Sequence, residues 1–185
     1  SQRKKLTVFF SDIVGFTAIS DELEAEEISS MLNYYLTEMS QLALNYGGTI
    51  DKYIGDAILI FFGDPETKGT KQDALQCVHM AMAMQYRMKE LENEWAENFG
   101  LREPLQIRIG IATGYCTVGN FGSENRLDYT VIGSQVNLAS RLEALARPAK
   151  ILLSFDTYSQ VSGDINCREL EKVMVKGIRD PVRTF

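Results

Sequence analysis

Two aspartates stand where an acidic side chain is unusual. Asp12 lies near the end of residues 6–13, an apolar run that is short, β-branched and aromatic like a buried strand. Asp56 lies in the turn of the hairpin-like segment 49–62. If these strands are neighbours, the carboxylates converge and offer the hard oxygen ligands that Mg²⁺ or Mn²⁺ prefers. Turn formation is the commoner role for Asp56 alone, but Asp12 is costly there without a cation or hydrogen-bond donors.

A short loop and a later helix add groups that suit a phosphate ligand. Residues 14–17, Val-Gly-Phe-Thr, lead towards a predicted helix start, where backbone N–H groups hold phosphate oxygens without side-chain help. In the helix predicted over 134–146, Asn137 and Arg141 are four residues apart and share one face. Such a pair usually lies on the solvent-exposed face of a helix, and it gains a chemical role only beside a triphosphate.

The elements that position these groups follow from hydrophobic periodicity. A capping box of Asp21 and Glu24 predicts a helix start, and Gly47-Gly48 ends that helix. A long helix is predicted over about 71–99, with Met82 and Trp95 among its inward residues. Further strands are predicted at 6–13, 105–113, 115–121, 127–132 and 151–153, and two more lie within 49–62, separated by Gly55-Asp56. A helix is predicted at 155–161, and strand pieces follow Cys167.

This order predicts an α+β fold, a ferredoxin-like βαββαβ sandwich with a C-terminal α/β subdomain. Its helices are expected to cover one face of an antiparallel sheet, which leaves the other face for a partner. Residues 1–185, 45% of them hydrophobic and 24% charged, suit a single globular domain. The chain does not begin with Met, so we expect a fragment of a larger multidomain protein that a sensor or membrane module could precede.

Composition also excludes several classes of protein. A net charge of −6 and a pI near 4.9 argue against nucleic acid as a partner. No apolar run approaches the ~20 residues of a membrane-spanning helix, so this piece is expected to be soluble and cytoplasmic. The cysteines form no C-x-x-C pair, which indicates a reducing compartment and no zinc site; they are Cys77, Cys116 and Cys167. The only histidine, His79, is expected to pack on the long helix rather than to catalyse.

Residues 9–17, 47–56 and 128–143 resemble blocks of the class III nucleotidyl cyclase catalytic domain, most closely the bacterial adenylyl cyclase domains. The blocks are long and in the family's order, and the resemblance covers nearly the whole chain. It implies a head-to-tail homodimer whose active sites lie at the interface. It also implies two Mg²⁺ or Mn²⁺ ions per site, held by Asp12, Asp56 and the carbonyl of Ile13, with phosphates cradled by the backbone around Gly15, Phe16 and Thr17.

The resemblance assigns the rest of each site to the opposing protomer. Lys52 and Thr130 would read the base, and Asn137 would orient the ribose region. Arg141 would stabilise the transition state, and Lys176 would hold the terminal phosphates.

The pair Lys52 and Thr130 points to ATP as substrate. Adenine presents an acceptor at N1 and a donor amino group at N6, and guanine reverses this order. Lysine only donates, whereas threonine can accept, and guanylyl cyclases of the family usually carry an acid in place of Lys52. Thr130 departs from the Asp of many adenylyl cyclases and resembles the subgroup stimulated by bicarbonate. Its uncharged hydroxyl predicts looser discrimination against GTP.

The expected reaction is attack of the ribose 3′ oxygen on the α-phosphorus of ATP, which yields 3′,5′-cyclic AMP, a second messenger, and pyrophosphate. Alternatives are a guanylyl cyclase and a non-catalytic cyclase homology domain that binds nucleotide or only dimerises. A diguanylate cyclase shares the topology, but its turn usually reads Gly-Gly-Asp/Glu-Glu-Phe, unlike residues 53–57.

Overall fold

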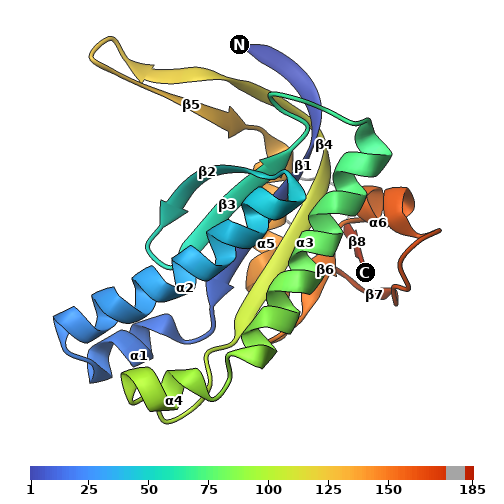
Figure 1. The fold of residues 1–185 in the computed structure, drawn as a ribbon. Coiled ribbons are helices and arrows are strands. Elements are labelled where there is room, and N and C mark those ends of the chain that lie inside the picture. Colours follow the sequence, from blue (N-terminus) through green and yellow to red (C-terminus); the bar gives the residue numbers. More distant parts are fainter. Residues whose placement is uncertain (174–181) are drawn as a thin grey trace.

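The computed structural model describes residues 1–173 and 182–185. The main sheet of this part has the strand order β2 (Thr49–Ile54), β3 (Ala57–Phe62), β1 (Gln2–Ile13), β4 (Ile107–Ser123), β5 (Arg126–Ile132), and β6 (Ile151–Leu153) pairs with β4 (Figure 1). All pairs are antiparallel except β4 with β6. The predicted ferredoxin-like order is therefore confirmed.

Two long helices cover one face of this sheet (Figure 1). They are α2 (Ala25–Tyr46) and α3 (Thr70–Glu90), flanked by the short helices α1 (Phe16–Glu22) and α4 (Glu94–Phe99). Their buried side chains form the larger hydrophobic cluster with Phe9 and Ile13 of β1. Because side chains alternate along a strand, Leu6 and Val8 point to the opposite face and belong to a second cluster.

Helix α5 (Ser134–Leu145) covers part of that opposite face. The expectation that this face waits for a partner was too simple, because Leu138 and Leu142 of α5 pack there within the same chain. Gly110 of β4 permits the approach: a Cβ at this position would lie 2.2 Å from the backbone N of Glu143. The missing side chain thus sets how closely α5 lies against the sheet.

Helix boundaries on the first face differ from prediction in two places. The capping box is formed by Glu24 and Glu27 rather than by Asp21 and Glu24, because α1 occupies the residues before Leu23. The predicted helix 71–99 is two helices. The turn between them lets Trp95 fold back into the core, where its ring meets that of Tyr34 edge-on with centroids 5.8 Å apart.

Two further details differ from the sequence-based expectations. Met82 was expected inside but is 46% exposed, because the buried stripe of α3 runs through residues such as Ala81 and Met84. The strands predicted at 105–113 and 115–121 are one continuous strand, β4, which pairs with β1 through Gly114 opposite Leu6.

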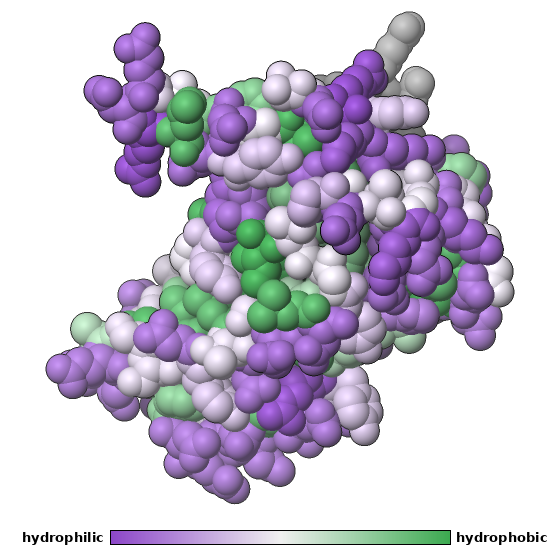
Figure 2. All heavy atoms as spheres, turned by 45° about the horizontal axis from the view of Figure 1, so that its top comes forward, coloured by the Kyte–Doolittle hydropathy of each residue, from purple (hydrophilic) through white to green (hydrophobic). Residues whose placement is uncertain are grey.

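The outer part of β4 and β5 forms a hairpin arm that projects from the body (Figure 1). In Figure 2 the arm overhangs a hollow in which hydrophobic surface is visible. The chain continues through α6 (Phe155–Val161) to a small antiparallel sheet of β7 (Leu170–Val173) and β8 (Val182–Thr184). This agrees with the expected C-terminal α/β subdomain. Within the described ranges, no helix has the length and apolar character needed to cross a membrane.

Candidate active site

Asp56 and the end of β1 meet in the structure. The β2–β3 turn is built around Gly55, whose φ of +61° is accessible to glycine. Because β3 pairs with β1, this turn lies beside the end of β1. Oδ2 of Asp56 accepts a hydrogen bond of 2.8 Å from the backbone N–H of Ile13, the residue after Asp12. The strand ends that carry the two aspartates therefore converge as the sequence suggested.

Burial and the neighbouring carboxylate both disfavour the charged form of Asp56. Burial raises the pKa of Asp56, and the negative charge of Asp12 raises it further. The hydrogen bond from the backbone N–H of Ile13 lowers it. Two carboxylates and the nearby Ile13 carbonyl are a hard oxygen donor set that suits Mg²⁺ or Mn²⁺. No group of three or more His, Cys, Asp or Glu side chains among the described residues forms a metal cage. A set of two carboxylates fits a metal that shares its ligands with substrate phosphates.

Arg108 belongs to the same corner, although no motif in the sequence indicated it. It lies opposite Asp12 in the pairing of β1 with β4. Its Nε and Nη2 donate to Oδ1 and Oδ2 of Asp12 at 3.2 and 3.0 Å, a bidentate ion pair. The signal available in the sequence was a guanidinium between the apolar Ile107 and Ile109 of a buried strand.

Glu143 of α5 completes the cluster around Arg108. Its Oε2 lies 3.7 Å from Nη2 of Arg108, and its side chain is only 8% exposed. Burial raises the pKa of Glu143 to about 8, and the interaction with Asp12 also raises it, while Arg108 opposes the rise. One guanidinium thus faces Asp12 and Glu143, with Asp56 close by.

The predicted phosphate loop lies directly after β1. Gly15 has a left-handed backbone, with φ of 65°, and is the N-cap of α1. It offers no side-chain cap to the first turn of α1, and the N–H groups of a first turn have no acceptor within their own helix. The backbone of Gly15, Phe16 and Thr17 is therefore placed next to the acidic corner with donors for an anion.

The structure links Thr130 to Asp51, the residue that precedes Lys52. Thr130 on β5 is buried, and its hydroxyl donates to Oδ2 of Asp51 at 2.6 Å. Asp51 also accepts from the backbone N–H of Val131 at 3.4 Å. Lys52 is the next residue along β2 and is exposed. Asp51 was not singled out from the sequence, because an acid beside a lysine is a common pattern on a solvent-exposed strand.

Asn137 and Arg141 lie on the exposed side of α5, while the intervening Leu138 and the following Leu142 are buried. Among the described residues, no hydrogen bond or ion pair joins the side chain of Asn137 or Arg141 to Asp12 or Asp56. Within one chain, these two residues therefore make no direct bond to the acidic corner. Lys176 lies outside the described residues.

The comparisons with known proteins agree with this geometry. Residues 1–185 match the family model of the adenylate and guanylate cyclase catalytic domain. The solved adenylyl cyclase CyaB from P. aeruginosa is 56% identical, with a TM-score of 0.96 over 99% of this chain and 93% of that chain. The solved guanylyl cyclase Cya2 is 37% identical, with a TM-score of 0.91 over 99% of this chain and 91% of that chain.

Among curated proteins, the adenylate cyclase of Anabaena cylindrica is 37% identical over 146 residues, which are 78% of this chain and 28% of that protein. The chain spans 8% to 31% of the length of the first curated relatives that it matches. Taken with the convergent aspartates at the end of β1, these matches show that the chain belongs to the family of adenylate and guanylate cyclase catalytic domains, the class III nucleotidyl cyclases.

Proposed function

We propose that this domain is an adenylyl cyclase that converts ATP to 3′,5′-cyclic AMP and pyrophosphate in the cytoplasm. The likeness to CyaB and to the Anabaena enzyme supports this proposal. The likeness to the guanylyl cyclase Cya2 means that the family alone does not choose the base. The observation that carries the choice of ATP is the hydrogen bond from Thr130 to Asp51, next to Lys52.

This hydrogen bond determines what Thr130 offers to a base. The single O–H of Thr130 donates to the Asp51 carboxylate. The lone pairs of the hydroxyl oxygen therefore remain free to accept a hydrogen bond. The ammonium group of Lys52 can only donate. A donor from Lys52 and an acceptor from Thr130 would match N1 and the amino group of adenine, and they would oppose the N–H and carbonyl of guanine.

We assign the acidic corner to the metals and the triphosphate. Asp12, Asp56 and the carbonyl of Ile13 would hold two Mg²⁺ or Mn²⁺ ions. When bound, these ions would lower the pKa of the ribose 3′ hydroxyl and neutralise charge on the phosphates. The backbone N–H groups around Gly15 would supply donors for phosphate oxygens at the same corner. The guanidinium of Arg108 would hold Asp12 in position through its bidentate ion pair.

We place the remaining roles on a second protomer. Asn137 would orient the ribose, Arg141 would stabilise charge on the α-phosphate, and Lys176 would hold the terminal phosphates. The exposure of Asn137 and Arg141 supports this division, since both are accessible to another chain.

A homodimer also explains exposed apolar side chains on the two edge strands of the main sheet. Tyr53 and Ile54 of β2 are 45% and 54% exposed, and Tyr129 and Ile132 of β5 are 50% and 48% exposed. A symmetric pair of chains that covers these strands would create two equivalent active sites.

The test is product formation by the purified chain with ATP or GTP and Mg²⁺ or Mn²⁺, over a protein dilution series. Cyclic AMP from ATP, with specific activity that falls on dilution, is the expected result. Preference for GTP would replace the proposal with a guanylyl cyclase. Absence of product at high concentration, despite dimers seen by analytical ultracentrifugation, would favour a binding-only homology domain.

The same assay addresses regulation. We propose, from the pairing of Lys52 with Thr130, that bicarbonate stimulates turnover. Sodium bicarbonate is compared with sodium chloride at equal ionic strength and pH, and equal rates in the two salts would remove this part of the proposal.

A further inference from the structure

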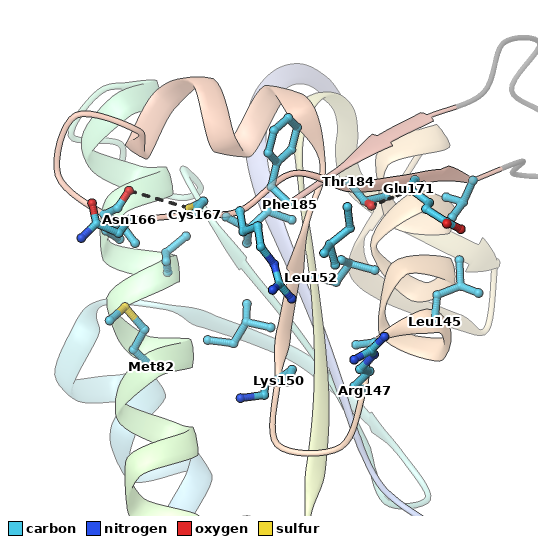
Figure 3. Close-up of a pocket in the computed structure, with 18 residues that line it drawn as sticks. Met82, Leu145, Arg147, Lys150, Leu152, Asn166, Cys167, Glu171, Thr184 and Phe185 are labelled. Carbon is cyan, nitrogen blue, oxygen red and sulfur yellow. Dashed lines mark hydrogen bonds between the residues drawn. The ribbon is translucent and has the colours of Figure 1, made fainter.

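A cavity of about 640 Å³ lies away from the acidic corner, between α3, the end of α5, β6 and the C-terminal segments (Figure 3). Its volume falls within the range of about 300–1,000 Å³ that is usual for small-molecule sites. Asp12, Asp56 and Arg108 do not line it. The roles proposed above leave this cavity without a function.

The lining combines an apolar wall with an excess of positive charge. Met82, Leu152 and Phe185 contribute apolar surface (Figure 3). The charged groups in the lining are three cations and one acid, namely Arg147, Lys150, Arg168 and Glu171. None of these three cations forms an ion pair with a carboxylate in residues 1–173 or 182–185. Such a lining favours a ligand with an anionic head and an apolar body.

The loop that carries two of these cations is held in place. Lys150 N–H donates to the carbonyl of Arg147 at 3.0 Å, which closes a turn. Ala149 within this turn has a φ of 64°, a left-handed conformation that costs energy for alanine. The amide of Gln85 on α3 holds the turn by donating to the carbonyl of Lys150 at 3.2 Å. Arg147 and Lys150 are therefore presented at the same end of the cavity (Figure 3).

The same loop is bonded to β4 on both sides of Arg108. Ala149 N–H donates to the carbonyl of Ile107 at 2.9 Å, and Ile109 N–H donates to the carbonyl of Lys150 at 3.2 Å. Arg108 itself donates from Nη1 to the carbonyl of Ala144 at 3.0 Å, just before the cavity-lining residues of α5. A ligand that shifts the loop would therefore act on the backbone that positions Arg108.

We propose that this cavity is an effector site for an organic anion with an apolar body, such as an alkyl carboxylate or alkyl phosphate, and that the 147–150 loop couples it to Arg108. The binding part stands independently of the proposed function. The coupling part rests on the proposed function, because it is read as a change in cyclase turnover.

Cys167 provides a direct assay of binding. It lines the cavity, whereas Cys77 and Cys116 are buried, at 0% and 2% exposure. Burial raises the pKa of Cys167, so iodoacetamide labelling is followed by mass spectrometry at mildly alkaline pH. Decanoate, below its micelle concentration, should protect Cys167, and decyltrimethylammonium, with the same tail and opposite charge, should not. Decyl phosphate is tested beside decanoate, and tighter binding of either supports the site and identifies its head group.

Substitutions locate the anion. The double variant Arg147→Gln with Lys150→Gln should weaken protection by decanoate about tenfold or more, since each tenfold corresponds to about 1.4 kcal/mol. Lys68→Gln, an exposed lysine outside the cavity, should leave protection unchanged, and thermal melting checks the fold of each variant. Equal protection by the ammonium compound, or no loss of protection in a folded double variant, would overturn the anion site.

Coupling is measured with the same proteins. Saturating decanoate should change the rate of cyclic nucleotide formation in the unsubstituted chain and not in the double variant. Protection of Cys167 with an unchanged rate in an active enzyme would overturn the coupling and keep the site. An inactive chain that still shows charge-selective protection would count against the proposed cyclase function and support the binding site.

Discussion

The hydroxyl of Thr130 donates to Oδ2 of Asp51 over 2.6 Å and joins β2 to β5, the two ends of the main strand order. Through this contact Asp51 is a positioning residue for the Thr130 hydroxyl. Under the proposed function, Asp51 would orient the threonine oxygen as an acceptor for adenine, and Lys52 would be the donor.

The first prediction concerns this orientation. Asp51→Ala frees the Thr130 hydroxyl to donate, so the ratio of kcat/KM for ATP to that for GTP should fall by about tenfold, the effect of one misplaced hydrogen bond. Steady-state kinetics with both nucleotides measure it. Thr130→Ser keeps the hydroxyl and should largely retain the ratio. An unchanged ratio in a folded, active Asp51→Ala enzyme would refute the orienting role.

Arg141 should act on turnover more than on binding. Arg141→Ala removes one preorganised donor to the α-phosphate, and kcat should fall by about 10²–10³-fold with a much smaller change in KM. Arg102→Ala, at an exposed arginine outside the acidic corner and the cavity, is the matched control and should keep kcat. Unchanged turnover in Arg141→Ala would remove Arg141 from the mechanism.

A shared site predicts complementation between inactive chains. Asp56→Ala impairs the metal corner, and Lys52→Ala impairs the base-reading pair. If these groups come from opposite protomers, one intact site forms in each mixed dimer, and activity returns when the two variants are combined. The activity of the mixture is measured with heterodimers verified by differently tagged chains. Verified heterodimers without activity would contradict the shared site.

Glu143 should make the metal-free fold less stable as pH rises. Burial raises its folded-state pKa to about 8, above the value near 4.3 of an unfolded chain. Between these two pKa values, the Glu143 carboxyl is protonated in the folded state and ionised in the unfolded state. The stability that this proton contributes is lost as pH rises through about 8. Glu143→Gln should flatten the decline of Tm over that interval, measured with a chelator present. Parallel Tm profiles for both proteins would contradict the shift.

Gly110 tests the fit of α5 against the sheet. An added Cβ would lie 2.2 Å from the backbone N of Glu143 and 2.4 Å from the carbonyl of Ala139. Gly110→Ala should destabilise the fold by about 1–3 kcal/mol or more, because overpacking shifts a whole helix. Urea unfolding measures this, and Gly163→Ala, with no atom within 4 Å of its added Cβ, should change stability little. Similar stabilities for the two variants would show that α5 moves freely.

The amino-acid sequence by itself determined the local elements and the family. Periodicity placed the β2–β3 hairpin, α5 and α6 close to their observed bounds, because alternation and helical spacing are properties of neighbouring residues. It also placed the end of β1 at Ile13, but β1 begins at Gln2 rather than at Leu6. The three cyclase blocks likewise identified the family, and the position of Asp12 at the end of an apolar strand pointed to a cation site.

Only the tertiary structure decided which distant residues share a site. Arg108 is separated from Asp12 by 96 positions and Thr130 from Asp51 by 79, and no periodicity relates them. The register of β1 with β4 made the first contact, and the approach of β5 to β2 made the second. The same holds for α5, since the side-chain space left by Gly110 let it pack on the face expected to wait for a partner. Long-range packing determines these contacts, and a local pattern carries no information about them.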